Sequence, residues 1–449
     1  MSSTTFLVPL LLGILMIPSS HAQSSTTCPN DPARCVEDAL NGLGQWYNLT
    51  TGLWETAGWW NNANIMTTLG NLAEADPYNA AVQKQVRRTF FNAIGHATIK
   101  NPAPNKERPP KPKSTSPKMV QLGKPYSKHL DPITYLPHSD YPESWFLHAP
   151  SAGNSINLLI NDQNFLPENT LRDFTPDPYD WLDGYYDDDL WWALAWIGAY
   201  DLDPKPVYLN LAKGIFDIVA KGWGTNCGHG GIYWSDAKQY VNAIANELFF
   251  STAAHLANRV DDKATYAAWA EKSLKWFLSS GMRNKNGTIN DGLDGTKCKN
   301  NGKTVWSYNQ GVILGGLVEF DRATSNATLL HIASDIASAA LKALSDADGV
   351  IHDVCDQDGT CGADGVQFKG VFIRNLGELW SATGNDKFKA AINTNARSIW
   401  KTDKQEDKSG VVFGNKWAGP FEGPANAAMQ GSAMDALVAN VVIAQRKAT

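Results

Sequence analysis

The sequence predicts an all-α protein with the architecture of an (α/α)6 barrel, in which six helical hairpins form two concentric rings. Helical periodicity dominates the chain, strand signals are scarce, and two kinds of helix alternate. Connectors rich in Gly, Pro, Asn and Asp separate the helices. The expected helices are residues 36–48, 57–73, 79–98, 187–201, 206–221, 238–259, 262–280, 305–322, 327–345, 368–382, 385–401 and 426–446.

The alternation of helix types predicts which helices lie inside. Odd-numbered helices from the third to the eleventh are ordinary amphipathic helices, as in residues 262–277, with one apolar stripe and one polar face. Even-numbered helices continue as nearly uncharged runs of small residues, and a helix that is apolar all round is buried. Inner helices joined through outer ones run parallel, so their N-termini meet at one mouth. An open solenoid is the alternative, and in a solenoid the starts of these helices would line a groove.

Dense clusters of polar and aromatic residues open the even-numbered helices. In a barrel these clusters share one cleft. They comprise residues 59–64, 185–192, 240–247, 306–310, 367–370 and 429–435. Two short stretches, 230–234 and 411–413, are expected to be pieces of β-hairpin.

Composition excludes some classes of protein. The 449 residues are 43% hydrophobic and 19% charged, so a sizeable core can form. The 39 basic and 45 acidic side chains give a net charge of −6, which offers no electrostatic footprint for nucleic acid. The 17 Trp residues suit the stacking surfaces of a sugar-binding cleft, although most Trp residues in proteins are packed in cores.

The N-terminal region predicts export. An apolar run at 6–17 and the small-residue site Ser20-His21-Ala22 are typical of a signal peptide covering residues 1–22. The run is too short to span a membrane, no later segment is expected to span one, and the polar C-terminus lacks a lipid-anchoring tail. Residues 23–449 are expected to form a single domain of a secreted protein, in the extracellular space or at the cell wall. Glycosylation sequons occur at Asn48, Asn286 and Asn326.

Six cysteines remain after cleavage, an even number that suits an oxidising compartment. Two pairs are close enough in sequence for local disulfides, which leaves the third pair for a long-range bridge. The expected pairs are Cys28–Cys35, Cys355–Cys361 and Cys227–Cys298. No paired C-x-x-C or nearby Cys/His cluster indicates zinc, so no metal and no cofactor are expected.

Residues 99–180 depart from the helical pattern. Between Lys100 and Lys128 the chain carries eight Lys/Arg and seven Pro, a composition typical of an unstructured, solvated loop. A basic patch for an acidic partner is the alternative. The segment is interpreted as an insertion in the barrel, which could serve as a lid.

Three consecutive carboxylates, Asp187, Asp188 and Asp189, precede Leu190-Trp191-Trp192. Acidic residues also stabilise the first turn of a helix, so helix capping explains them equally well. Retaining glycosidases need two carboxyl groups roughly 5–5.5 Å apart, and neighbouring residues diverging by roughly 100° can provide this spacing. Either Asp187 with Asp188 or Asp188 with Asp189 would serve, and mutual repulsion in an apolar cleft would keep one member protonated.

Other catalytic signatures are missing. The sequence has no H-E-x-x-H, G-x-S-x-G, P-loop or dinucleotide motif. The acidic stretch 346–358 fails the calcium-loop alternation at Val354 and is interpreted as a turn closed by Cys355 and Cys361.

Several motifs resemble glycoside hydrolase family 76, the endo-α-1,6-mannanases of bacteria and fungi. The order and spacing are similar to the fungal branch over about 36–98 and 180–446. The resemblance rests on residues 187–197 (DDDLWWALAWI), 227–234 (CGHGGIYW), 242–249 (NAIANELF), 308–311 (YNQG) and 368–374 (FKGVFIR).

The resemblance implies an (α/α)6 barrel that cleaves α-1,6-mannan with retention, with Asp187 as nucleophile and Asp188 as acid/base. Asp189 would assist or cap the helix. The implied partner is α-1,6-linked mannan or a related cell-wall polysaccharide, bound by a monomer. The candidate sugar contacts are Trp59, Trp60, Asn64, Asp189, Trp191, Trp192, Tyr308, Asn309 and Gln310, with core packing an equal alternative for the buried indoles.

Three other functions stay open. A transglycosylase would pass the same covalent intermediate to a sugar hydroxyl instead of water. A non-catalytic mannan-binding wall protein would keep the barrel without turnover. A polysaccharide lyase would need His/Tyr bases and basic residues, which the motif-bearing helices do not supply.

Overall fold

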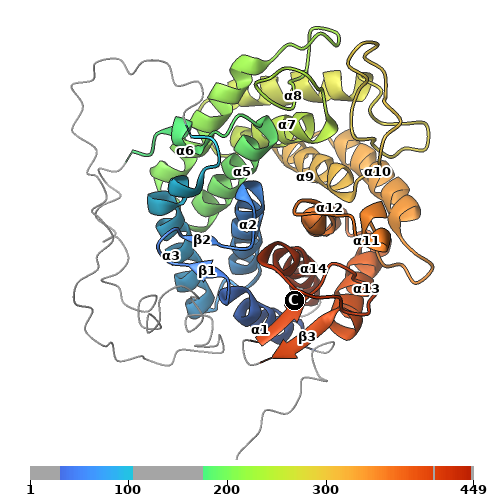
Figure 1. Cartoon of the computed structure of the whole chain (residues 1–449). Coiled ribbons are helices and arrows are strands. Elements are labelled where there is room, and N and C mark those ends of the chain that lie inside the picture. The colour runs from blue at the N-terminus through green and yellow to red at the C-terminus, as the bar shows by residue number, and fades with distance from the viewer. Residues whose placement is uncertain (1–30, 105–174, 408–409, 446–449) are drawn as a thin grey trace, which may run out of the picture.

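The computed structural model describes residues 31–104, 175–407 and 410–445, and within these residues the protein is an all-α double ring (Figure 1). The inner ring consists of α2 (Trp59–Ala75), α5 (Tyr186–Leu202), α7 (Ala243–Ala257), α9 (Ser307–Thr324), α12 (Phe368–Thr383) and α14 (Ala427–Gln445). The outer ring consists of α1 (Pro32–Gly44), α3 (Ala80–His96), α6 (Pro206–Val219), α8 (Lys263–Ser279), α10 (Thr328–Leu344) and α13 (Asp386–Thr402).

The inner ring is closed. Each inner helix packs against the next one, and α14 packs against α2, so the barrel prediction is confirmed over the open solenoid (Figure 1). All twelve expected helices are present, with shifted ends. The helix expected at 238–259 begins only at Ala243, because the Asn242 side chain caps its first turn and the preceding residues form a loop.

Glycines let the inner helices approach closely. A Cβ on Gly370 of α12 would lie 2.6 Å from the Cα of Ser432 on α14, a distance at which the backbones would have to separate. Seven residues further along both helices, Gly377 faces Ala439. The two helices therefore run in the same direction, and their N-termini lie at the same end of the barrel.

Two small hairpins accompany the helices in the described part of the chain. β1 (Tyr47–Asn48) pairs with β2 (Leu53–Trp54), and β3 (Lys404–Asp407) pairs with β4 (Gly410–Phe413), in antiparallel register. The strand expected at 411–413 is therefore confirmed.

The strand expected at 230–234 is wrong. Residues 226–229 form a turn and 230–234 are irregular, and Gly228, His229 and Gly231 have positive φ angles of 72°, 53° and 71°. Such left-handed residues interrupt an extended strand. A single β-bridge joins Tyr185 to Ser235 just after the turn.

Short helices complete the described connections. They are η2 (Ala97–Lys100), η6 (Pro178–Trp181), η7 (Ala220–Gly222), α11 (Val354–Asp358) and η8 (Gly365–Gln367). The expected turn between Cys355 and Cys361 thus begins as one helical turn, which ends at Gly359 with a φ of 70°.

The expected signal peptide, 1–22, and most of the 99–180 insertion lie outside the described residues. The two ends of the insertion are close together. The Asn101 side-chain amide donates to the backbone oxygens of Asp180 and Leu182, at 2.9 and 2.8 Å. The chain therefore leaves the barrel and returns to it at one place.

The disulfides Cys227–Cys298 and Cys355–Cys361 are present, as expected. Cys35 is also disulfide-bonded, while its expected partner Cys28 lies outside the described residues.

By length and composition α14 could cross a membrane, contrary to the expectation that no later segment could. In the structure 78% of its apolar window is buried inside the protein. Its position in the inner ring explains its hydropathy.

Candidate active site

The three consecutive carboxylates occupy the first turn of α5, at the N-terminal mouth of the inner ring. Asp187 is 8% exposed, Asp188 is partly exposed and Asp189 is 1% exposed. Asp189 accepts a hydrogen bond from the backbone N–H of Asp183 at 3.1 Å, so it supports the preceding turn. Asp187 and Asp188 are therefore the candidate catalytic pair.

An indole holds Asp187. The Nε1–H of Trp234 donates to Oδ2 of Asp187 at 3.0 Å, whereas Oδ1 is buried without a partner among the described residues. Trp234 is 39% exposed and packs against Tyr185, with ring centroids 4.9 Å apart. One carboxylate oxygen is thus fixed and the other is free.

The loop that carries Trp234 is fastened at several points. The Asn246 side chain of α7 exchanges two hydrogen bonds with the backbone of Ile232, at 2.8 and 2.9 Å. The backbone N–H of Tyr186 donates to the oxygen of Trp234 at 2.9 Å. The Cys227–Cys298 disulfide ties the same loop to the connection between α8 and α9.

Burial separates these carboxyls from ordinary surface aspartates. Burial raises the pKa of Asp187 from 3.8 to about 7, and the Trp234 hydrogen bond opposes this rise. Burial also raises the pKa of Asp188 well above its usual value, with further increases from the charges of Asp187 and Asp183. Asp187 is therefore better supported as an anion and Asp188 as an acid.

Aromatic rings form a wall beside the pair. Trp60 stacks on Trp191 with centroids 5.9 Å apart, and Tyr308 stacks on Phe368 at 3.8 Å. Trp60 and Phe368 connect the two stacks, and the Trp60 indole donates to Asp364 at 2.8 Å. Trp60, Trp191 and Phe368 are 8%, 3% and 7% exposed, so packing against one another accounts for most of their surface and only a small part is open to a pyranose ring.

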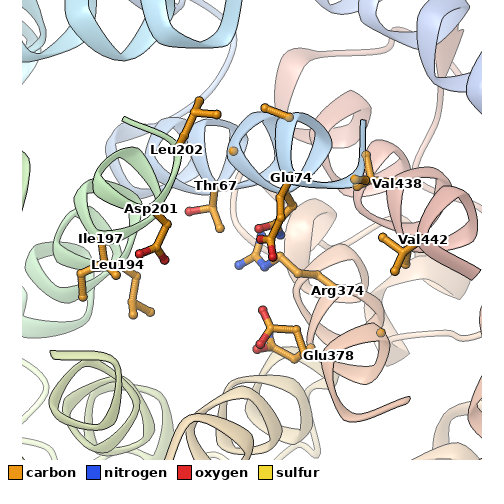
Figure 2. Close-up of a pocket in the computed structure, with 18 of the residues that line it drawn as sticks. Thr67, Glu74, Leu194, Ile197, Asp201, Leu202, Arg374, Glu378, Val438 and Val442 are labelled. Atoms are coloured by element: carbon orange, nitrogen blue, oxygen red, sulfur yellow. The ribbon is translucent and has the colours of Figure 1, made fainter. Parts of the chain in front are cut away.

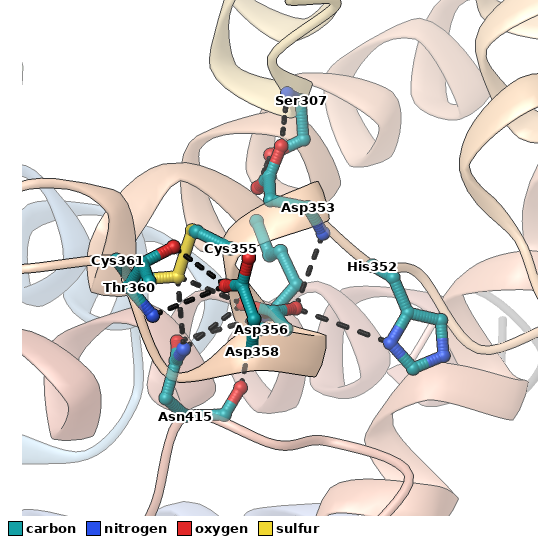
Figure 3. Close-up of a disulfide and its surroundings, with 10 residues drawn as sticks. Ser307, His352, Asp353, Cys355, Asp356, Asp358, Thr360, Cys361 and Asn415 are labelled. Carbon is teal, nitrogen blue, oxygen red and sulfur yellow. Dashed lines mark hydrogen bonds and ion pairs between the residues drawn. A yellow bond between two sulfur atoms is a disulfide. The ribbon is translucent and has the colours of Figure 1, made fainter.

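A buried carboxylate positions the start of α9. Asp353 accepts hydrogen bonds from the backbone N–H and the hydroxyl of Ser307, at 2.8 and 2.5 Å (Figure 3). This cap fixes the next residue, Tyr308. Burial raises the pKa of Tyr308 well above its usual value, and the charges of Asp187 and Asp291 raise it further.

Several predicted sugar contacts have structural partners instead. Trp192 is fully buried and packs on Trp59, at a centroid distance of 4.7 Å, and on Trp181 and Trp196. Asn64 accepts from Arg374 and donates to the backbone of Trp60. Among the predicted contacts, Trp60, Trp191 and Tyr308 belong to the cluster of rings, and Asn309 follows Tyr308 in the first turn of α9.

Gln310 also has a structural role. It exchanges two hydrogen bonds with the Ile289 backbone, both at 2.8 Å, and donates to Trp306. Its amide is therefore fully used in holding the loop before α9.

Sequence reasoning missed Trp234, Asp364 and Glu247. Trp234 and Glu247 fall inside the motifs at 227–234 and 242–249, so their signal was present, but nothing in the motifs shows which members face the site. Asp364 carries no local signal, because only the fold brings it to the Trp60 indole.

Two buried cations in the motif at 368–374 stabilise the barrel. Lys369 is fully buried and pairs with Asp356, which also accepts from Asn415 at 2.9 Å (Figure 3). Arg374 pairs with Asp435 at 3.0 Å. The sulfurs beside Asp356 belong to the Cys355–Cys361 disulfide, so they are not thiolate ligands for a metal.

A cavity of about 840 Å³ occupies the other end of the barrel interior (Figure 2). The C-terminal halves of the inner helices line it, and Glu74, Arg374 and Glu378 point into it. Neither Asp187 nor Asp188 lines this cavity. Arg374 and Trp191 lie at its boundary with the site, where the guanidinium is 6.0 Å from the indole centroid.

The closed helical barrel and the paired carboxyls beside an aromatic wall define a protein of the glycoside hydrolase class. The sequence profile of glycosyl hydrolase family 76 matches residues 148–449. The protein belongs to glycosyl hydrolase family 76, which confirms the resemblance found in its motifs.

Curated relatives and solved structures agree with this assignment. The chain is 28% identical over 283 residues to mannan endo-1,6-alpha-mannosidase DFG5 of Saccharomyces cerevisiae, covering 58% of this chain and 59% of that relative. It is similar in fold to an α-1,6-mannanase of Salegentibacter sp. HEL1_6, solved as an inactive variant with two consecutive aspartates replaced by asparagine, in complex with α-1,6-mannotriose. That match has a TM-score of 0.64 and 16% identity, and it covers 92% of this chain and all of the other.

A fungal structure is similar as well. Dfg5 from Chaetomium thermophilum, solved in complex with glucosamine, matches with a TM-score of 0.58 and 19% identity, over 86% of this chain and 81% of that one.

Proposed function

We propose that the protein is a secreted, wall-associated glycoside hydrolase that cleaves α-1,6-mannosidic linkages with retention of configuration. The observation that carries this proposal is the environment of the adjacent carboxyls. Asp187 receives the Trp234 N–H and Asp188 is surrounded by acidic neighbours, which suits an anion and an acid respectively.

Each carboxyl has a definite role in the proposed mechanism. Asp187 attacks the anomeric carbon while Asp188 donates a proton to the departing glycosidic oxygen, which forms a mannosyl ester on Asp187. Asp188 then removes a proton from water, which attacks the anomeric carbon and releases Asp187. Two inversions give net retention.

The relatives support the substrate. The curated match is named a mannan endo-1,6-alpha-mannosidase, and the structural neighbour with replaced aspartates holds α-1,6-mannotriose. The chain matches only 59% of the curated relative's length, so its own activity rests on the site described above and on experiment.

The test is incubation of the purified protein with linear α-1,6-mannan, with early products followed by proton NMR. We expect shorter chains whose new reducing ends first appear as the α-anomer. Asp187→Asn and Asp188→Asn should each lower turnover by at least about a thousandfold, since each removes one half of the two-carboxylate mechanism. Asp201→Asn, at the opposite end of α5, is the matched control. Initial β-anomer would contradict retention, and unchanged turnover in both site variants would contradict the catalytic assignment.

A second arm separates hydrolysis from the alternatives. Adding an oligosaccharide acceptor gives products longer than the starting chain if the mannosyl ester passes to a sugar hydroxyl. Binding of mannan without any new reducing ends would instead identify a non-catalytic wall protein.

A further inference from the structure

Glu247 is a carboxyl that the proposed mechanism does not use. It lies in the second turn of α7 and is 0% exposed. Both of its carboxyl oxygens are buried without a hydrogen-bond partner among the described residues. A buried carboxyl without a partner lowers the stability of the folded protein, unless a bound ligand supplies its hydrogen bonds.

The helix register places Glu247 on the inner wall of the barrel. Ser251 and His255, four and eight residues later on α7, line the interior cavity. Residues four apart lie on one face of a helix, so Glu247 faces the interior as well, one turn nearer the mouth that holds Asp187.

Asn309 is the matching feature on the neighbouring helix α9. It is 1% exposed, and both its side-chain oxygen and nitrogen lack partners among the described residues. It precedes Val312, which lines the cavity, by three residues, so it also faces inward. Because α7 and α9 are packed neighbours, the two unsatisfied side chains belong to one region of the wall.

The surroundings connect this region to the catalytic pair. Tyr308 precedes Asn309 in the first turn of α9, and its pKa is raised by burial and then by the charges of Asp187, Asp291 and Glu247. Burial and then Asp291 raise the pKa of Glu247 well above its usual value. This environment favours the neutral form of Glu247, which has one O–H donor and free acceptor positions.

We propose that Glu247 and Asn309 bind the hydroxyl groups of the sugar unit held next to Asp187, an inference that rests on the proposed function for the identity of that sugar. A neutral carboxyl can donate to one hydroxyl and accept from its neighbour, and the amide of Asn309 offers the same combination. The unsatisfied atoms of the ligand-free protein are then satisfied by the ligand.

The test is calorimetric titration of α-1,6-mannotriose into the full chain, in the Asp188→Asn background so that the sugar is not consumed. Glu247→Met, which keeps the length of the side chain and removes its polar atoms, should weaken binding by about 10- to 100-fold. Glu247→Gln keeps a donor and an acceptor, so it should weaken binding by less than about tenfold. Ser251→Ala, one turn away on the same face, is the control and should leave the affinity unchanged.

A second measurement does not depend on the identity of the sugar. The melting temperature of the ligand-free protein should rise in Glu247→Met, because a buried polar group without a partner is replaced by an apolar one. A lower melting temperature would show that Glu247 has a structural partner, and it would overturn the inference. Mannotriose affinity that is unchanged in Glu247→Met would overturn it too.

Failure of the proposed function gives a different pattern. If the Asp188→Asn protein does not bind mannotriose at all, the proposed substrate is wrong. The melting temperature of Glu247→Met then decides separately whether this side chain is reserved for a ligand.

Discussion

Asp187 and Asp188 carry the same functional group, but the structure gives them different partners. Asp187 has one oxygen bound to the Trp234 indole, and Asp188 has the charges of Asp187 and Asp183 around it. In the proposed mechanism, environment rather than residue type therefore gives Asp187 the role of anion and Asp188 that of acid.

Trp234→Phe tests this assignment at the level of one hydrogen bond. The change keeps a ring against Tyr185 but removes the N–H that stabilises the Asp187 anion, so the pKa of Asp187 should rise above about 7. The acid limb of the kcat/KM profile on mannan should shift upward by roughly one pH unit. Tyr185→Phe, which keeps the ring contact, should leave the limb in place. An unshifted limb in Trp234→Phe would remove the indole from the assignment.

The three sequons differ in accessibility. Asn286 and Asn326 are exposed, whereas Asn48 is 9% exposed and its side-chain nitrogen donates to Glu55. In protein secreted from a eukaryotic host, glycopeptide mass spectrometry should find glycans on Asn286 and Asn326 and not on Asn48. A fully occupied Asn48 would mean that the β1–β2 hairpin differs in the secreted protein.

The inner helices combine close backbone packing with a few buried charges. Gly370 allows α12 to approach α14, and Arg374 on α12 pairs with Asp435 on α14 beneath the aromatic wall. Asp435 also accepts from Thr68 of α2 at 2.7 Å, so one carboxylate joins three inner helices. The floor of the site is therefore fixed by polar contacts between helices.

Arg374→Met should destabilise the protein by about 3–5 kcal/mol, because it leaves the buried Asp435 carboxyl without its cation. Adding Asp435→Asn should recover part of this loss, since no unpaired buried charge then remains. Urea denaturation measures both. Arg322→Met is the matched control, because Arg322 has a side chain 53% exposed and its pairing with Glu319 should contribute no more than about 1 kcal/mol. Equal losses for the two arginines would contradict the argument.

Buried carboxyls from several elements give the whole molecule a characteristic pH dependence. Burial raises the pKa of Asp187, Glu378 and Asp403 to about 7. The stability from such groups is fully present below the unfolded pKa and is lost as pH rises through the folded pKa. Glu319 gives the stability a pH dependence of the opposite sign. Burial favours its neutral form, but His255 and Arg259 lower its pKa to about 2, so its contribution is lost as pH falls below 4.5.

Stability should therefore be greatest at about pH 4.5, close to the unfolded pKa values of these carboxyls, and fall by a few kcal/mol as pH rises to about 7. Urea unfolding at a series of pH values measures this. Asp187→Asn should flatten the decline between pH 5 and 8, because it removes one group whose pKa is raised. A stability that increases steadily from pH 5 to 8 would contradict the burial of these carboxyls.

The helices and their order could be predicted because their causes are local. Apolar periodicity, Asn242 as a cap and the uncharged inner runs all act over a few residues, so twelve helices and the inner-outer alternation followed from the sequence. The stretch at 230–234 failed for a local reason as well. The strand prediction there followed from β-forming residues and did not take into account the left-handed backbone of Gly228, His229 and Gly231.

For the candidate site, some features could be predicted from the sequence and others depend on the fold. Sequence alone was enough to locate the adjacent aspartates, the aromatic clusters and the helix ends at which they meet, because these depend on spacing along the chain. The fold, in contrast, bonds Gln310 fully to the Ile289 backbone and leaves its neighbour Asn309 with a buried amide that has no partner among the described residues. Successive residues of a helix point roughly 100° apart, and what each side chain meets depends on segments distant in the chain.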